Sequence, residues 1–231
     1  MRKGLLLIVA CVFTSFIYAQ ECQNAILFSK EGARLEYTDF NKKGKKNSVN
    51  SHETISLTND GNKVDVTIKL TIEDDKQDDP FSMDYNASCE NGVFSIDMVR
   101  FFNTTSLSQY NGGNMSVEID GNILSFPSEM KEDTVLNDGN ITVKIGNGNM
   151  TLVTMTMNIT NRKVHANESI TTSAGTFDCH KVTYDFDTKF GFIKTKGSGA
   201  EWYDKDKVLV KSESYNKKGK LMGYTELTKI N

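Results

Sequence analysis

Three histidines and one cysteine carry the side chains best suited to acid–base or nucleophilic chemistry. His52, His165 and His180 are far apart, and no H-x-x-x-H or H-E-x-x-H spacing directs two imidazoles at one metal ion. Cys179 directly precedes His180. In cysteine-dependent enzymes, a cysteine thiolate acts as the nucleophile and a nearby histidine as the base. Because neighbours on a strand point to opposite faces, these two side chains should not touch. We therefore interpret Cys179 as a packed structural cysteine.

Other motifs that carry chemistry are missing from the sequence. It contains no G-x-S-x-G, P-loop or G-x-G-x-x-G motif in a suitable context, and no complete EF-hand loop. The acidic run EDDKQDDP, from Glu73 to Pro80, is more typical of a solvated loop than of a cation site. The sequence therefore predicts no catalytic residue, no cofactor and no metal ligand, and an enzyme is the least favoured class of function.

The first 19 residues have the pattern of a secretory signal peptide. Arg2 and Lys3 precede an apolar run from Gly4 to Tyr18, which ends at the small residue Ala19. We expect cleavage after Ala19, export, and a mature chain without a transmembrane span. In the alternative, IVAC is a lipobox that makes Cys11 the lipidated first residue of a lipoprotein anchored in the envelope.

Composition favours one ordinary globular domain over residues 20–231. The formal net charge of -3 argues against nucleic acid as a partner, and charged residues make up 25% of the chain. Only two prolines are present, so extended linkers between domains are not expected.

Strict alternation of apolar and polar residues predicts half-buried antiparallel strands over most of the mature chain. It is clearest in VDVTIKLTIE, from Val64 to Glu73, and in VTMTMNIT, from Val153 to Thr160. We expect an all-β fold with roughly a dozen or more strands in a meander. The best helical candidate is a short segment from Met98 to Tyr110.

Asn-Gly and Asp-Gly pairs predict tight hairpin turns, because both tolerate the positive φ of type I′ turns. They occur at Asn59, Asp120 and Asn137, and a related GNGN segment begins at Gly146.

A second kind of turn occurs twice, as NKKGK from Asn41 and again from Asn216. Asparagine and lysine followed by glycine fit a type I turn with a G1 bulge. A basic patch for nucleic acid is disfavoured, because such surfaces need a larger field of lysine and arginine, and acidic residues lie nearby. We interpret the two segments as the same turn built twice.

Removal of Cys11 with the signal peptide leaves Cys22, Cys89 and Cys179 in an oxidising compartment. Cys22–Cys89 is the first choice of disulfide, because Cys22 lies on an N-terminal segment that can move to meet its partner. Cys89–Cys179 is the alternative.

Three segments resemble the TapB-type family of exported bacterial envelope proteins: FPSEMKEDTVLNDG from Phe126, AGTFDCHKVTYDF from Ala174, and AEWYDKDKVLVKSESYNKKGKLMGYTEL from Ala200. The chain departs from that family at Asp206, Lys207 and Val208, where the family usually carries GVG. The resemblance implies a single, strongly curved, mostly antiparallel sheet rolled on itself, a spiral β-roll or half-barrel of unknown function. It implies no catalytic residues.

The strand TFDCHKVTYDF, from Thr176 to Phe186, should carry apolar groups on both faces. We expect a long, curved, largely buried strand with Cys179 packed and His180 nearer the surface.

Two non-catalytic functions fit such a fold. The first is a binding module for an apolar or envelope-derived ligand such as a lipid, held in a groove of the rolled sheet. The alternative is a structural or assembly protein that contacts envelope proteins through its sheet edges. The candidate ligand lining consists of methionines that alternation could turn inward: Met83, Met98, Met150, Met155 and Met157.

Overall fold

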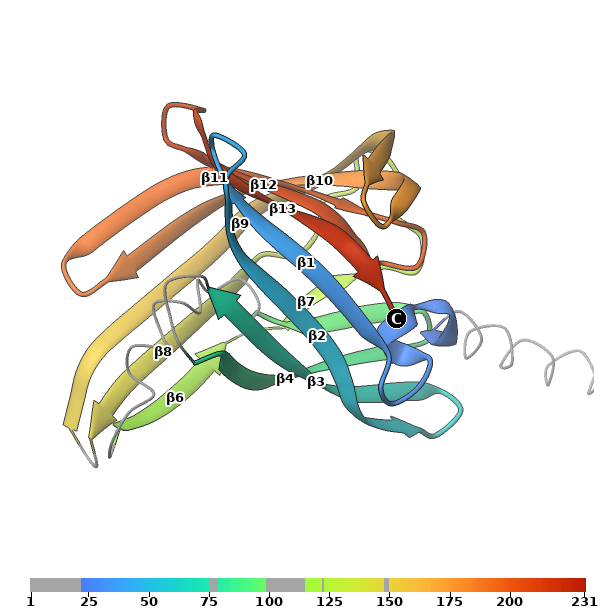
Figure 1. Ribbon diagram of the computed structural model, residues 1–231, viewed down its shortest axis with the longest axis horizontal. Helices are drawn as coiled ribbons and strands as arrows, with labels where there is room; N and C mark the ends of the chain where they lie inside the picture. Colours follow the sequence, from blue (N-terminus) through green and yellow to red (C-terminus); the bar gives the residue numbers. More distant parts are fainter. Residues whose placement is uncertain (1–21, 75–78, 99–114, 122, 148–149) are drawn as a thin grey trace, which may run out of the picture.

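The computed structural model describes residues 22–74, 79–98, 115–121, 123–147 and 150–231. These residues form a single antiparallel sheet in the order β6-β8-β9-β10-β11-β12-β13-β1-β2-β3-β4-β5-β7 (Figure 1). The expected all-β fold is confirmed. The elements are η1, a 3-10 helix (Ile26–Phe28), and the strands β1 (Arg34–Asn41), β2 (Lys46–Asn59), β3 (Lys63–Asp74), β4 (Phe81–Glu90), β5 (Val93–Asp97), β6 (Met115–Gly121), β7 (Ile123–Phe126), β8 (Gly139–Asn147), β9 (Met150–Thr172), β10 (Gly175–Phe190), β11 (Ile193–Tyr203), β12 (Leu209–Asn216) and β13 (Leu221–Ile230).

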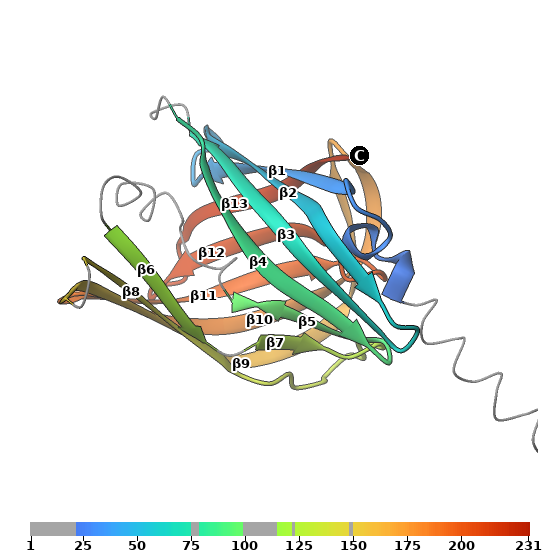
Figure 2. The same ribbon diagram turned by 90° about the horizontal axis from the view of Figure 1, so that it is seen from below.

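The sheet curls until its two edge strands approach each other. β6 and β7 stand at opposite ends of the strand order, yet β6 ends at Gly121 and β7 begins at Ile123. Because one residue cannot span a flat sheet of this width, the sheet has to roll up. Figure 2 shows the resulting arch, in which β5 and β7 lie near β9 and β10.

Alternation decides which side chains face the inside of the roll. On β3, Val64, Val66, Ile68 and Leu70 are buried, and the residues between them are exposed or half-buried. They join a continuous apolar core with residues of β4, β5, β8 and β9. The outer face is correspondingly polar.

The NKKGK segments form the same turn twice, as predicted. Gly44 and Gly219 have φ angles of 75° and 68°, in the left-handed region that favours glycine. The side-chain oxygen of the leading asparagine accepts bonds from the backbone N–H groups two and four residues later. The distances are 2.8 and 3.2 Å at Asn41, and 2.9 and 3.1 Å at Asn216.

Two of the four Asn/Asp-Gly predictions are wrong. The segment at Asn59 joins β2 to β3, and the segment at Gly146 leads from β8 to β9, although residues 148–149 lie outside the described part. The segments at Asp120 and Asn137 form no hairpin, because β6 pairs with β8 and β7 pairs with β5.

The physical reason is that an Asn-Gly or Asp-Gly pair permits positive φ without requiring it. Gly121 continues β6 opposite Ile141, so its backbone stays extended. The pair that does adopt positive φ at both residues is Asn91 (52°) and Gly92 (78°), between β4 and β5. This hairpin was not singled out from the sequence.

Two other predictions fall largely outside the described residues. The signal peptide, residues 1–19, with Cys11, is one of them. The other is the helical candidate, of which Met98 alone is described.

The roll has two different ends. At one, which we call the covered end, η1 packs inside the sheet: the Phe28 ring meets Phe94 edge-on at 5.4 Å, and Thr54 Oγ1 donates to the Leu27 carbonyl at 2.7 Å. A Cys22–Cys89 disulfide ties the segment before η1 to β4. At the other, which we call the open end, the hairpins β1–β2, β10–β11 and β12–β13 turn.

The strand β10 carries apolar groups on both faces, but it is less buried than expected. Cys179 packs with Trp202 on the outer face, whereas Val182 belongs to the main core. These two residues alone are fully buried on β10, because the strand is bulged and its second half projects with β11 toward the open end. His180 is more exposed than Cys179, although its Nδ1 is shielded without a hydrogen-bond partner in the described part of the chain.

Replacing Tyr184 by alanine is expected to lower the free energy of unfolding by about 2–4 kcal/mol, because its ring packs against the core. The ring also covers Gly199, where a Cβ would lie 2.3 Å from it. Equilibrium denaturation measures the loss. His180→Ala on the same strand should cost about 1 kcal/mol or less. Equal losses for both variants would contradict this assignment.

Candidate functional site

A cavity of about 600 Å³ occupies the inside of the roll. Its lining extends from Phe28 at the covered end to Phe40 and Tyr224 at the open end, and η1, β1 to β5 and β10 to β13 contribute to it. This position, on the concave side of a curved sheet, is a common place for a small-molecule site.

One wall of the cavity is apolar. Ile68 and Leu70 on β3, Ala87 on β4, and Phe94 and Ile96 on β5 are buried core residues that also line it. They lie there because alternation turns every second residue of these neighbouring strands inward. The wall therefore suits the hydrocarbon part of a ligand.

A polar cluster faces this wall nearer the open end. The Asp39 carboxylate accepts hydrogen bonds from Ser48 Oγ at 2.8 Å, from Asn50 Nδ2 at 2.7 Å, and from Thr225 Oγ1. Asn50 Oδ1 is buried and has no hydrogen-bond partner among the described residues. Asp39 thus holds the Asn50 amide in place, and both residues are on the cavity lining, although the Asn50 oxygen itself is shielded from the cavity.

An aromatic group links the polar cluster to the apolar wall. His52 Nδ1 and the Tyr85 hydroxyl are 2.9 Å apart, and the Tyr37 ring meets the His52 ring edge-on at 5.2 Å. All three side chains line the cavity. They offer rings for packing and a hydrogen-bonding group at the boundary between the two walls.

The turn between β11 and β12 brings charged groups to the cavity. Lys207 has a φ of 63° and donates from Nζ to the carbonyls of Ser128 and Lys205 at 2.9 and 3.0 Å. Asp204, in the same turn but not among the residues that line the cavity, has a pKa raised by burial, although backbone N–H groups of the turn donate to its carboxylate. Glu201, also on the lining, accepts a hydrogen bond from the Tyr203 hydroxyl.

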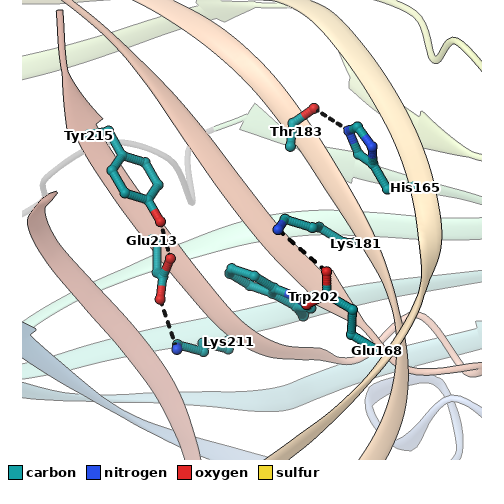
Figure 3. Close-up of polar contacts among 8 residues, drawn as sticks. All are labelled: His165, Glu168, Lys181, Thr183, Trp202, Lys211, Glu213 and Tyr215. Carbon is teal, nitrogen blue, oxygen red and sulfur yellow. Dashed lines mark hydrogen bonds and ion pairs between the residues drawn. The ribbon is translucent and has the colours of Figure 1, made fainter. Parts of the chain in front are cut away.

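A second polar arrangement lies on the outer face, and sequence reasoning missed it (Figure 3). Trp202 Nε1 donates to Glu168 Oε2 at 2.9 Å, and the Lys181 and Lys211 ammonium groups lie 5.0 and 5.4 Å from the Trp202 ring centroid. Lys211 also pairs with Glu213 at 2.8 Å. Trp202 is the single tryptophan of the chain, and this was the feature of the sequence that could have pointed to the cluster. These partners cover the ring, so the cluster stabilises the sheet.

The candidate residues for chemistry stay apart in the structure. His52 lies at the cavity, His165 bonds Thr183 Oγ1 at 2.7 Å on the outer face (Figure 3), and His180 lies on the opposite face of β10 from Cys179. Burial raises the pKa of the free Cys179 thiol to about 12. In the described part of the chain, no group of three His, Cys, Asp or Glu residues could hold a metal ion.

None of the five candidate methionines is among the residues that line the cavity. Met98, Met155 and Met157 are buried in the apolar core, and Met83 packs against it. Met150 is 62% exposed near the start of β9. Alternation turned Met155 and Met157 inward, but on β9, whose inner face is packed core rather than cavity wall, and Met98 lies just after β5.

A family model and solved structures both match this chain. A model of the DUF3108-like family matches residues 30–227. The chain belongs to the DUF3108-like family. The match includes every strand of the cavity wall, whereas η1 and Cys22 precede it. The narrower TapB-type assignment stays a prediction.

Two solved structures have a similar fold, although their sequences are less than 25% identical to this chain. A protein assigned as exported, with a YmcC-like fold, from Bacteroides fragilis NCTC 9343 has a TM-score of 0.75 and 23% identity, and the alignment covers 87% of this chain and 96% of that one. A protein assigned as a lipoprotein, from Parabacteroides distasonis ATCC 8503, has a TM-score of 0.75 and 24% identity, with 90% and 99% covered. A comparison with curated protein sequences finds no match. No helix within the described residues is long and apolar enough to cross a membrane.

Proposed function

We propose that this DUF3108-like protein is an exported, non-catalytic binding module that takes an amphipathic ligand, such as a lipid of the cell envelope, into the cavity of its roll. The observation that carries the proposal is the division of the cavity into an apolar wall and a polar cluster. The predicted signal peptide supports export, and so do the names of the two similar proteins, one assigned as exported and one as a lipoprotein.

The orientation of the ligand follows from the lining. Its hydrocarbon part would lie against Leu70, Phe94 and Ile96, because burial of apolar surface is favourable at about 25 cal/mol per Å². Its polar head would lie near Asp39 and Asn50, at the side of the open end.

The head group should be a hydrogen-bond donor. The Asp39 carboxylate lies on the lining and has acceptor capacity beyond its three protein donors, so a hydroxyl, amide or amine of the ligand fits this side of the cavity. Hydrogen bonds within the protein fix the orientation of the Asp39, Asn50 and His52 side chains, as expected for a site that recognises a ligand.

Native mass spectrometry of protein purified from its own envelope tests the proposal directly. We expect a bound species that organic solvent extracts and that has a long apolar part. Protein recovered repeatedly without a ligand, and unable to bind a monoacylglycerol or phosphatidylethanolamine added afterwards, would overturn the proposal.

Narrowing the cavity should weaken binding without unfolding the protein. Ala87→Phe places a ring on the cavity wall, so the affinity for a dansyl-labelled long-chain alcohol is expected to fall at least about tenfold in fluorescence titrations. Asn86→Phe adds the same ring to the exposed face of β4 and is the matched control, with affinity unchanged. Thermal melting checks that both variants fold. Equal affinity for the two variants would place the ligand elsewhere.

A further inference from the structure

The fold brings the two NKKGK turns side by side. β1 pairs with β13, and in this register Asn41 stands opposite Gly223, so the β1–β2 and β12–β13 turns lie next to each other at the open end (Figure 1). The Phe40 and Tyr224 rings stack directly behind them at 4.8 Å. Two segments that are 175 positions apart in the sequence thus form one surface.

Lysine is the only charged residue type in the two turns, and all of the lysines are exposed. None of them forms an ion pair within the described part of the chain. By contrast, Lys63, Lys144, Lys163 and Lys196 on the strands each pair with a carboxylate. The turn lysines are Lys42, Lys43, Lys45, Lys46, Lys217, Lys218 and Lys220.

A third hairpin at the same end presents apolar side chains to solvent. The β10–β11 turn carries Phe192, whose side chain is fully exposed, and Ile193, which is 66% exposed. β11 pairs with β12, and Gly197 stands opposite Asn216, so this hairpin projects past the lysine turn that follows β12. We call the seven lysines together with Phe192 and Ile193 the tip surface.

The apolar tip of the β10–β11 hairpin stands apart from the two lysine turns but at the same end of the roll (Figure 1), and an end that presents both exposed lysines and exposed apolar side chains is typical of proteins that dock on lipid. Each lysine near an anionic bilayer contributes about 1 kcal/mol, and apolar side chains that enter the interface add to this. Acidic groups lie close by: Glu73 and Asp74 stand opposite Val49 and Ser48, beyond the β1–β2 turn. They limit the basic field to one side of the open end.

We propose that the tip surface docks the protein on an anionic lipid bilayer, with the lysine ammonium groups at the lipid phosphates and Phe192 and Ile193 in the interface. This inference rests on the arrangement of the hairpins, not on occupancy of the cavity, so either proposal can fail alone. Docking of this kind would face the open end of the cavity toward the membrane.

Vesicle co-sedimentation of the purified protein tests the inference. We expect binding to vesicles that contain phosphatidylglycerol, little binding to pure phosphatidylcholine vesicles, and loss of binding at high salt, because salt screens surface charge. Changing Lys42, Lys43, Lys217 and Lys218 to glutamine should weaken binding at least about tenfold. Phe192→Ser should weaken it further, with the dependence on phosphatidylglycerol retained.

Matched controls separate the tip surface from net charge and from general stickiness. Glutamine at Lys63, Lys131, Lys144 and Lys163, each of which pairs with a carboxylate away from the tip surface, changes the net charge equally, and Val135→Ser removes an exposed apolar side chain elsewhere. Neither should affect binding. An equal loss of vesicle binding in these controls, or equal binding to both vesicle types, would overturn the inference. Competition from soluble glycerol phosphate at matched concentration would also overturn it, and so would binding to heparin or DNA without binding to vesicles.

Discussion

Replacing Arg162 by alanine is expected to lower the free energy of unfolding by about 3–5 kcal/mol. Arg162 is 2% exposed and projects from β9 toward β7, the far edge of the strand order. Its Nη1 donates to the carbonyls of Asn137 at 2.9 Å and Ser125 at 3.3 Å. The guanidinium carbon also lies 4.7 Å from the Phe126 ring centroid.

These contacts join β9, the third strand from one edge of the rolled sheet, to β7 at the opposite edge. Alanine would leave buried carbonyls on β7 and on the segment before β8 without this donor, and it would open a cavity beside Phe126. Arg162→Lys keeps the charge but has no planar fork, so it should lose an intermediate amount.

Equilibrium denaturation measures the stability, and hydrogen exchange of the β7 amides shows whether the closure opens first. The matched control is Arg34→Ala, because Arg34 pairs with Glu36 near the surface and should contribute about 0–1 kcal/mol. If Arg162→Ala lost no more than Arg34→Ala, the closing role would be wrong.

Removing the Cys22–Cys89 disulfide is expected to cost about 4 kcal/mol. The bond closes a loop with a sequence separation of 67, and the chain-entropy model gives a loss of this size for so long a loop. It also holds the segment before η1, so η1 should detach from Phe94 when the bond is absent.

The double variant Cys22→Ser/Cys89→Ser should therefore melt well below the wild type, and reduced wild-type protein should match it. Cys179→Ala is the control, with a smaller loss from packing alone. Thiol labelling checks the pairing: unfolded, unreduced protein should react at one thiol, and folded protein at none, because burial raises the pKa of Cys179 to about 12. Two or more reactive thiols would contradict the bond.

Local patterns predicted the strands and the repeated turn. Val64 to Ile72 alternate strictly, and burial in the structure follows that alternation because a strand turns successive side chains to opposite faces. The NKKGK turns were also predictable, since the asparagine side chain closes each turn with N–H groups no more than four residues away. Such interactions need no partner elsewhere in the chain.

The sequence alone determined an all-β chain with polar outer faces and two identical lysine turns. Only the tertiary structure decided that Asp120 continues a strand, that Arg162 joins β9 to the edge strand β7, that the methionines pack away from the cavity, and that the two turns meet. Each of these depends on the register and curvature of pairings between distant strands. A period of two residues says which face a side chain takes, but not which strand lies beside it.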